Sequence, residues 1–256
     1  MNKLVFLLKL NEQDLKNNLY EKLVDYGMNP SYKDGYVYAK GTIPVMLVAH
    51  MDTVFLPPIN IEFDSLNGKL YAENSGLGGD DRCGVYTILK VLEHGYRPHV
   101  LFTEEEEKGN IGATKVIKSL DRPDLKYIIE IDRRGSNDCV FYECGNESFI
   151  SYIESFGFNK NYGTFTDISV LAPSWDIAAV NISCGYYNEH TKNEYIIYSE
   201  VLNNINRLEN ILDYYKDIDY FDYQKELMPT PDMTDEEIEE IIERMKEKRK
   251  NKLLKK

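Results

Sequence analysis

Five short segments of this 256-residue chain place acidic residues or a histidine at the end of a predicted strand or in a loop. Each segment alone is compatible with an ordinary surface loop or helix start. Together they predict a pocket lined by carboxylate and imidazole groups, which are ligand types that hold divalent metals such as zinc. The fold must therefore bring all five segments to one place. In chain order, the segments contain His50 with Asp52, Asp80 with Asp81, Glu104 to Glu107, Asp132, and His190.

Apolar runs and amphipathic patterns alternate along the chain and predict a layered fold. Helices are expected at residues 11–26, 80–93, 111–120 and 199–215. Strands are expected at residues 36–39, 44–49, 68–72, 99–103, 127–131 and 178–183. Phe141, Phe149 and Tyr152 are expected in short antiparallel strands. Strands that alternate with helices are typical of a sheet covered on both faces, so we predict a three-layer α/β/α fold with a central, mostly parallel mixed sheet.

The end of the chain differs in composition from the rest. Residues 228–231 read Met-Pro-Thr-Pro, which predicts a stiff break. Thr234 and Glu237 have the spacing of a helix capping box, and the following acidic and then basic residues suit the two ends of a helix dipole. We predict one domain over residues 1–227, followed by a proline-containing linker and a charged helix over residues 228–256. This helix is expected either to be solvated or to dock on another subunit or partner.

Bulk properties exclude several classes of protein. The formal net charge of −13 argues against a general nucleic-acid binder. No run approaches the ~18 to 20 apolar residues of a membrane span, and the start lacks a secretory pattern. The four cysteines have no CxxC spacing, so we expect free thiols in a reducing compartment and a cytoplasmic location.

Two of the segments have a clear local chemistry. Residues i and i+2 of an extended chain point the same way, so Asp52 can hydrogen-bond the far nitrogen of His50 and orient it as a ligand. A surface histidine beside an aspartate is the ordinary alternative. Asp80 follows three glycines and opens a helix, where it can bind a metal, cap the helix, or do both.

The other segments also allow two interpretations each. Glu106 and Glu107 can supply a base and a ligand side by side, although a run of glutamates more often marks an exposed loop. Asp132 lies at the expected carboxyl edge of the sheet, where open α/β folds place their sites, but it can also pair with an adjacent arginine. His190, taken alone, would more often be structural.

The five segments, taken in order, resemble the superfamily of co-catalytic dinuclear zinc exopeptidases. This superfamily includes tripeptidases of the peptidase T type, glutamate carboxypeptidases, aminoacylases and the tetrahedral aminopeptidases. The resemblance runs from about residue 44 to residue 196 and implies the fold predicted above. The matching phrases are residues 50–54 (His-Met-Asp-Thr-Val), 79–84 (Gly-Asp-Asp-Arg-Cys-Gly), 102–109, 129–132 (Ile-Glu-Ile-Asp), 188–191 (Asn-Glu-His-Thr) and 193–195.

The resemblance implies a specific division of the metal ligands. His50, Asp80 and Asp132 would hold one ion, and Asp80, Glu107 and His190 would hold the other, so that Asp80 bridges the two. Two divalent ions ~3.5 to 4 Å apart share such a carboxylate in known dinuclear sites. Zinc suits this set of nitrogen and oxygen ligands, and cobalt or manganese can substitute.

The resemblance also implies a reaction. Glu106 would be the general base that takes a proton from water, and Asp52 would orient His50. The expected activity is hydrolysis of a terminal peptide bond of a short peptide through a metal-bridging hydroxide, which would make residues 1–227 the catalytic domain. Two alternatives stay open: hydrolysis of an N-acyl amino acid or another small amide at the same site, and a non-catalytic binding or assembly protein on this fold.

This chain departs from many relatives in length. Asp52 and Asp80 are 28 positions apart, and Asp132 and His190 are 58 apart. Neither gap accommodates a lid or dimerisation domain of ~50 residues or more in addition to the core elements. We therefore predict a reduced catalytic domain with an open site. Arg82 stands where many relatives have lysine and is expected either to be structural or to contact the metal ligands without binding the ions.

The sequence gives few indications of the substrate. Arg133 or Arg134 could bind a substrate carboxylate, as in a carboxypeptidase or dipeptidase. Asp167, Glu104 or Glu105 could instead bind a free amine, as in an aminopeptidase, and Tyr187 with its neighbour Tyr186 could line the pocket. Structural ion pairs are the alternative for the charged residues, and packing under the loop is the alternative for the two tyrosines. The expected partner is a short peptide or acyl-amino-acid substrate, without nucleic acid or membrane, and self-association into a homo-oligomer is left open.

Overall fold

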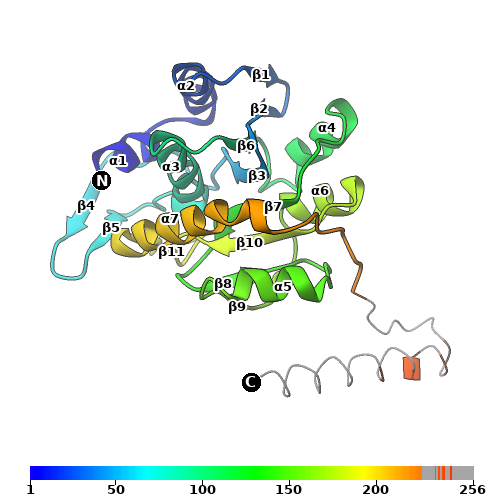
Figure 1. Cartoon of the computed structure of the whole chain (residues 1–256). Coiled ribbons are helices and arrows are strands. Elements are labelled where there is room, and N and C mark those ends of the chain that lie inside the picture. The colour runs from blue at the N-terminus through cyan, green and yellow to red at the C-terminus, as the bar shows by residue number, and fades with distance from the viewer. Residues whose placement is uncertain (227–233, 235, 237, 240–242, 244–256) are drawn as a thin grey trace. The chain divides into compact units, whose positions relative to one another are not determined.

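The structure is a computed structural model that describes residues 1–226 together with residues 234, 236, 238, 239 and 243. The chain divides into two units, Met1–Gln224 and Lys225–Lys256. The first unit contains all of the helices and strands discussed below (Figure 1). The predicted C-terminal helix lies largely outside the described residues; among the residues that are described, the amide of Ile238 donates to the carbonyl oxygen of Thr234 at 3.0 Å.

An eight-stranded mixed sheet forms the centre of the first unit. Its four middle strands, β6, β3, β7 and β10, run parallel to one another, which confirms the predicted mostly parallel centre. Antiparallel strands flank them on both sides. Across the sheet, the strands are β1 (Pro30–Lys33), β2 (Tyr36–Ala39), β6 (Pro98–Thr103), β3 (Ile43–His50), β7 (Tyr127–Arg133), β10 (Ala179–Ser183), β8 (Asp138–Val140) and β9 (Asn159–Lys160).

Helices cover both faces of this sheet, as predicted (Figure 1). Alternate side chains of β3 face opposite sides, so Leu47 packs in one buried cluster and Val48 in the other. The helices α4 (Ile111–Ser119) and α6 (Asp167–Trp175) pack on the face of Val48. The opposite face is covered by α1 (Asn2–Leu8), α2 (Glu12–Asp25), α3 (Gly79–Glu93), α5 (Glu147–Glu154) and α7 (Tyr198–Asp213). A short 3-10 helix, Tyr215–Asp217, follows α7.

A second, four-stranded antiparallel sheet stands beside the first. It joins two segments that are far apart in sequence, because β5 (Lys69–Ala72) pairs with β12 (Tyr195–Ile197). The remaining strands are β4 (Ile61–Asp64) and β11 (Tyr186–Tyr187). This sheet was not predicted, although its strand β5 was, and it places the loop before α3 next to the loop between β11 and β12.

Two details of the sequence prediction are wrong. Phe149 and Tyr152 lie in helix α5 and not in a strand, because the side chain of Asn146 caps that helix by accepting from the amide of Phe149 at 3.1 Å. The sequence pattern also placed Val24 with Leu15, Leu19 and Leu23 on one apolar face of α2; the three leucines are buried, but Val24 is 50% exposed.

Two expectations from composition can be compared with the described residues. All four cysteines are free and buried: Cys83, Cys139, Cys144 and Cys184. Within the described part of the chain, no helix is both long and apolar enough to cross a membrane.

Candidate metal centre

The carboxyl ends of the parallel strands bring several of the predicted ligands to one edge of the main sheet. His50 is the last residue of β3, Asp132 lies near the end of β7, and Glu106 and Glu107 follow β6. A cavity of about 180 Å³ opens at this edge. Its lining residues are Asp80, Glu106, Glu107, Asp132, Arg133, Arg134, Tyr142, Thr164, Phe165, Tyr186, Glu189 and His190.

The first predicted ligand set converges on one histidine nitrogen. His50 Nε2 lies 2.9 Å from Asp80 Oδ1 and 3.6 Å from Asp132 Oδ1. The other ring nitrogen, Nδ1, lies 3.3 Å from Asp52 Oδ1, on the side away from the cavity. His50 is therefore held between a carboxylate behind it and two carboxylates in front of it.

The second predicted set converges in the same way. His190 Nε2 lies 2.7 Å from Glu107 Oε1 and 3.2 Å from Asp80 Oδ2. Asp80 thus turns one oxygen to His50 and the other to His190, which is the arrangement that a bridging carboxylate needs. His190 has a backbone φ of 59°, a left-handed conformation that is costly for a histidine and that often marks a functional loop.

Among the residues that the structure describes, three groups of side chains have ligand atoms close enough to share an ion, within 4.8 Å of one another. One group is the predicted set of Asp80, Glu107 and His190. Another contains His50 and Asp132 with Asp81, where Asp80 was predicted. Asp81 Oδ1 accepts from the amide of Gly84 at 2.8 Å, whereas its Oδ2 is buried without a hydrogen-bond partner. Asp80 lines the cavity and fits the bridging position better than Asp81. The third group is His50 with Glu106 and Glu107.

The acidic groups around this cavity carry more negative charge than the protein compensates, which favours bound cations. Burial and the charge of Asp80 raise the pKa of Asp132 to about 7, and burial with nearby acidic groups raises the pKa of Glu106 to about 9. Hydrogen bonds to Asp80 and Glu107 raise the pKa of His190 to about 10. These groups retain protons because the site holds more negative charge than it can stabilise alone. Divalent ions would displace such protons, so the donor set fits two metals of the zinc type.

Asp52 does more than face His50. Its two carboxylate oxygens accept from the backbone amides of Glu106 and Glu107, at 3.0 and 3.2 Å. Burial raises the pKa of Asp52, but the interactions with His50 and these amides outweigh burial and lower it overall. Asp52 therefore ties the glutamate loop to the strand that carries His50.

Glu194 is a buried residue to which the sequence assigned no role. Its Oε2 accepts from the amides of Leu77 and Gly78, at 2.8 and 2.7 Å, and its Oε1 accepts from the amide of Asp80 at 3.1 Å. Glu194 lies in the loop of His190, so one carboxylate fixes the turn before α3 to that loop. The sequence signals were its place in the matching phrase at residues 193–195 and its position four residues after a candidate ligand.

The predicted substrate-binding residues fall in different places. Arg133, proposed from the sequence to bind a substrate carboxylate, lines the cavity. Asp167 is fully buried, accepts from the hydroxyl of Thr103, and does not line the cavity. Tyr187 donates to Glu200 at 2.5 Å and also lies outside the lining. The neighbouring Tyr186 lines the cavity instead, and its hydroxyl donates to Asp132 Oδ1 at 3.1 Å.

Other charged candidates form structural ion pairs. Glu104 accepts from Lys16 at 2.6 Å and Glu105 accepts from Lys108 at 3.1 Å, so neither offers a free carboxylate to an amine. Arg82 is buried, and its guanidinium donates to the carbonyl oxygens of Leu7, Leu10 and Met51. Arg82 is therefore structural, as expected, and anchors α1 to α3.

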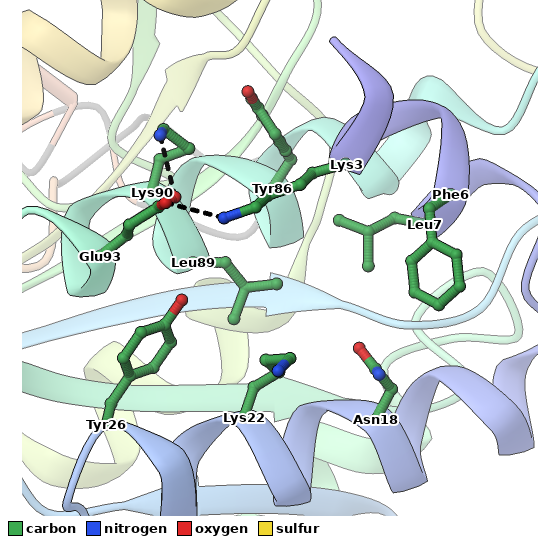
Figure 2. A pocket seen from close by; sticks show the side chains of 10 residues that line it. All are labelled: Lys3, Phe6, Leu7, Asn18, Lys22, Tyr26, Tyr86, Leu89, Lys90 and Glu93. Carbon is green, nitrogen blue, oxygen red and sulfur yellow. Dashed lines mark hydrogen bonds and ion pairs between the residues drawn. The ribbon is translucent and has the colours of Figure 1, made fainter.

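A second cavity, of about 160 Å³, lies between α1, α2 and α3 (Figure 2). Leu7 and Leu89 contribute apolar surface to it, while Lys3 and Lys90 both reach Glu93, at 2.7 and 2.9 Å. Its lysines already have acidic partners, and it shares no lining residue with the candidate metal centre.

Comparisons by sequence identify no relative, since no protein-family model and no curated protein matches the chain. Solved structures do match by fold. A tripeptidase from Staphylococcus aureus has a TM-score of 0.69 at 15% identity, over 85% of this chain and 98% of that one. The aminopeptidase PepT from Bacillus cereus has a TM-score of 0.67 at 15% identity, over 84% and 97%. An aminopeptidase from the archaeon Desulfurococcus kamchatkensis has a TM-score of 0.59 at 16% identity, over 85% and 96%.

Identities this low show the fold alone. The match nevertheless extends over most of this chain, including its main sheet and the helices that cover it. This chain therefore has the zinc exopeptidase-like fold that its five sequence segments implied.

Proposed function

We propose that this protein is a metallo-exopeptidase that hydrolyses a terminal peptide bond of short peptides at the candidate metal centre. The observation that carries the proposal is the position of Asp80, whose two oxygens lie 2.9 Å from His50 and 3.2 Å from His190. One ion would be held by His50, Asp80 and Asp132, and the other by Asp80, Glu107 and His190. Zinc suits these ligands, and cobalt or manganese could replace it.

Glu106 is the proposed general base. It lines the cavity, is 7% exposed, and stands beside the ligand Glu107. Two bound divalent ions would polarise the scissile carbonyl and acidify a water molecule. Glu106 would accept a proton from that water as its oxygen bonds to the carbonyl carbon, and would pass the proton to the nitrogen as the C–N bond breaks. Asp52 would hold Glu106 in place through the backbone amides of the loop.

Self-association is a further part of the proposal. The TET1 peptidase from Pyrococcus horikoshii can assemble into a tetrahedron or a large octahedral shell. It has a TM-score of 0.59 to this chain at 14% identity, over 78% of this chain and 94% of that one. A homo-oligomer is therefore the state to look for in solution.

The deciding experiment combines elemental analysis with turnover of a mixed peptide library, with and without a chelator. We expect two metals per chain and chelator-sensitive loss of terminal residues. Glu106→Gln should retain both metals and lose at least about a hundredfold in kcat, because general-base catalysis contributes ~10²- to 10⁴-fold. Glu105→Gln is the matched control, since Glu105 belongs to the same glutamate run but pairs with Lys108.

Two results would contradict the proposal. A chain that binds no metal after reconstitution at neutral pH has no dinuclear site. Turnover by Glu106→Gln at the rate of the Glu105→Gln control would remove Glu106 as the base. Two bound metals without peptide turnover would favour N-acyl amino acids or another small amide as the substrate.

A further inference from the structure

The charged groups that line the candidate metal centre can be assigned almost completely. Three carboxylates, those of Asp80, Glu107 and Asp132, would bind the metals, and Glu106 would act as the general base. The remaining acidic residue, Glu189, accepts from Arg134 Nη1 at 2.7 Å, so these two charges offset each other. Among the described residues that line this cavity, Arg133 is then the charged group whose counterion, Asp138, lies outside the lining and 3.9 Å away.

Arg133 has unused hydrogen-bonding capacity. Its Nη2 donates to the carbonyl oxygen of Tyr162 at 3.2 Å, and the carboxylate of Asp138 is 3.9 Å away, beyond hydrogen-bonding distance. Asp138 already accepts from the amide group of Asn161 at 2.7 Å. The Nε of Arg133 is buried without a partner. A guanidinium has five N–H donors in a planar fork that matches a carboxylate, so Arg133 is equipped for an anionic ligand.

A free amine finds no comparable partner in this cavity. The two glutamates that could have bound an amine, Glu104 and Glu105, pair with lysines elsewhere. Asp167 is 0% exposed and is not part of the lining. The cavity, once loaded with two dications, would therefore attract the negatively charged end of a peptide and not its positively charged end.

The position of Arg133 limits the distance between a substrate carboxylate bound there and the scissile bond. Arg133 directly follows the ligand Asp132 and lines the same cavity of about 180 Å³. Each residue of an extended peptide spans at most ~3.3 to 3.6 Å. A carboxylate on Arg133 therefore belongs to the residue on the leaving side of the scissile bond or to the next one.

We infer that Arg133 binds the free α-carboxylate of the substrate, so that the chain removes C-terminal residues or cleaves dipeptides. This inference rests on the proposed function and adds the substrate end to it. Hydrolysis adds one water across the terminal C–N bond, and the released amino acid retains the carboxylate that Arg133 holds.

The test uses two pairs of otherwise identical short peptides on the zinc-loaded full chain. One pair has a free or an amidated C-terminus, and the other has a free or an acetylated N-terminus. We expect amidation to lower kcat/KM by about tenfold to a hundredfold, the usual worth of a charge-assisted hydrogen-bonded pair. Acetylation of the N-terminus should change kcat/KM less than twofold.

The variant Arg133→Gln distinguishes binding of the substrate carboxylate by Arg133 from a purely structural role of this residue. This variant should raise KM for the free-carboxylate peptide and reduce the preference over the amide to about twofold or less. Arg133→Lys should restore part of that preference. Arg134→Gln is the matched control, because Arg134 is already paired, and it should keep the preference of the native chain. A residue with only a structural role would affect the free and amidated peptides equally.

A binding measurement gives a readout that needs no turnover. Zinc-loaded Glu106→Gln should bind the free-carboxylate peptide at least tenfold more tightly than the amide, and Arg133→Gln added to it should remove the difference. Equal kcat/KM of the native chain for the free and the amidated C-terminus would overturn the inference. Loss of activity on N-acetylation would also overturn it and would indicate an exopeptidase that acts at the amino end. No cleavage of any peptide would overturn the proposed function itself.

Discussion

Glu194 shows how a residue that binds no ion can control an ion's ligands. Its carboxylate joins the amides of Leu77, Gly78 and Asp80 to the loop that carries His190. Two ligands of the proposed second metal therefore depend on one buried side chain. Groups that orient ligands typically change metal affinity by ~10- to 100-fold when they are removed.

The prediction for Glu194 concerns the metal ion proposed to bind at Asp80, Glu107 and His190. Glu194→Ala should weaken its binding by about tenfold to a hundredfold, because the amide of Asp80 loses its acceptor, while Glu194→Gln should restore part of the affinity. Competition of zinc with a chromophoric chelator measures this. Glu200→Ala is the control, since Glu200 also accepts from a residue of the β11–β12 hairpin, Tyr187. Equal affinity in Glu194→Ala and this control would rule out the positioning role.

A second residue-scale prediction concerns pH and lies far from the metals. Burial, together with the charge of Lys40, lowers the pKa of His99 to about 4 from 6.5, and Tyr38 hydrogen-bonds its Nδ1 at 2.8 Å. Between these two pKa values the unfolded chain binds a proton that the folded chain does not. The stability that neutral His99 contributes is therefore complete above pH 6.5 and lost as the pH falls towards 4.

Denaturant titrations of the metal-free chain between pH 7 and pH 4 measure this effect. The unfolding free energy of the native chain should fall by roughly 2 kcal/mol more than that of His99→Gln, which does not titrate there. Parallel curves for the two proteins would show that His99 does not contribute to the pH dependence.

The ligand candidates could be predicted from the sequence because each sits beside a strand or helix end that local patterns locate. His50 and Asp132 need only the position where β3 and β7 end. The substrate residues could not be predicted in this way. Whether Asp167 or Tyr187 faces the cavity depends on where α6 begins and how β11 pairs, and both features are set by contacts distant in sequence.

At the scale of elements, α3 packs on β7 through a glycine. A Cβ added to Gly84 would lie 2.2 Å from the backbone oxygen of Ile131 and 2.4 Å from Asp81 Oδ2. A backbone oxygen cannot move aside as a flexible side chain can. The close approach of helix and strand therefore keeps Asp80 and Asp132 near each other.

Gly84→Ala should accordingly destabilise the fold by about 2 to 3 kcal/mol, the upper range for overpacking a core, and weaken zinc binding. Denaturant unfolding and chelator competition measure the two effects. Thr87→Val, on the same helix, is the control: it replaces a buried hydroxyl that has no hydrogen-bond partner and should be neutral or stabilising. An unchanged unfolding free energy in Gly84→Ala would show that α3 can shift freely.

The elements differ in how well local patterns predict them. The central strands and α2, α3, α4 and α7 have long apolar runs or stripes, and their bounds agree with the prediction within one or two residues. Helix α5 was missed because its short sequence, with Phe149 and Ile153 buried, does not separate a helical from a strand pattern. The small sheet depends on the pairing of β5 with β12, which no local pattern encodes.

At the scale of the whole molecule, the first unit contains the described buried clusters and both sheets. Its last residues take part in the fold, since Phe221 packs against the core and the carbonyl of Gln224 accepts from Gly145 at 2.6 Å. The boundary between the two units falls after Gln224.

A chain that ends after residue 226 should therefore fold, bind two metals and retain the kcat of the full chain within about twofold. Elemental analysis and peptide turnover check this expectation. Light-scattering masses of the full and the shortened chain would also show whether residues 227–256 mediate self-association. Loss of the metals in the shortened chain would mean that the second unit contributes to the site.

The four buried thiols have a practical consequence for following this molecule over time. Cys83 and Cys184 are both 0% exposed, and Cys184 Sγ lies 3.8 Å from Oδ1 of Asp81, the neighbour of the proposed bridging residue Asp80. A thiol-specific dye can react with any of the four only when the structure opens locally, and Cys83, which lies on α3, reports the opening of that helix. The labelling rate of Cys83 in the native protein therefore measures how often α3 opens beside the candidate metal centre, and the measurement needs no added reporter group.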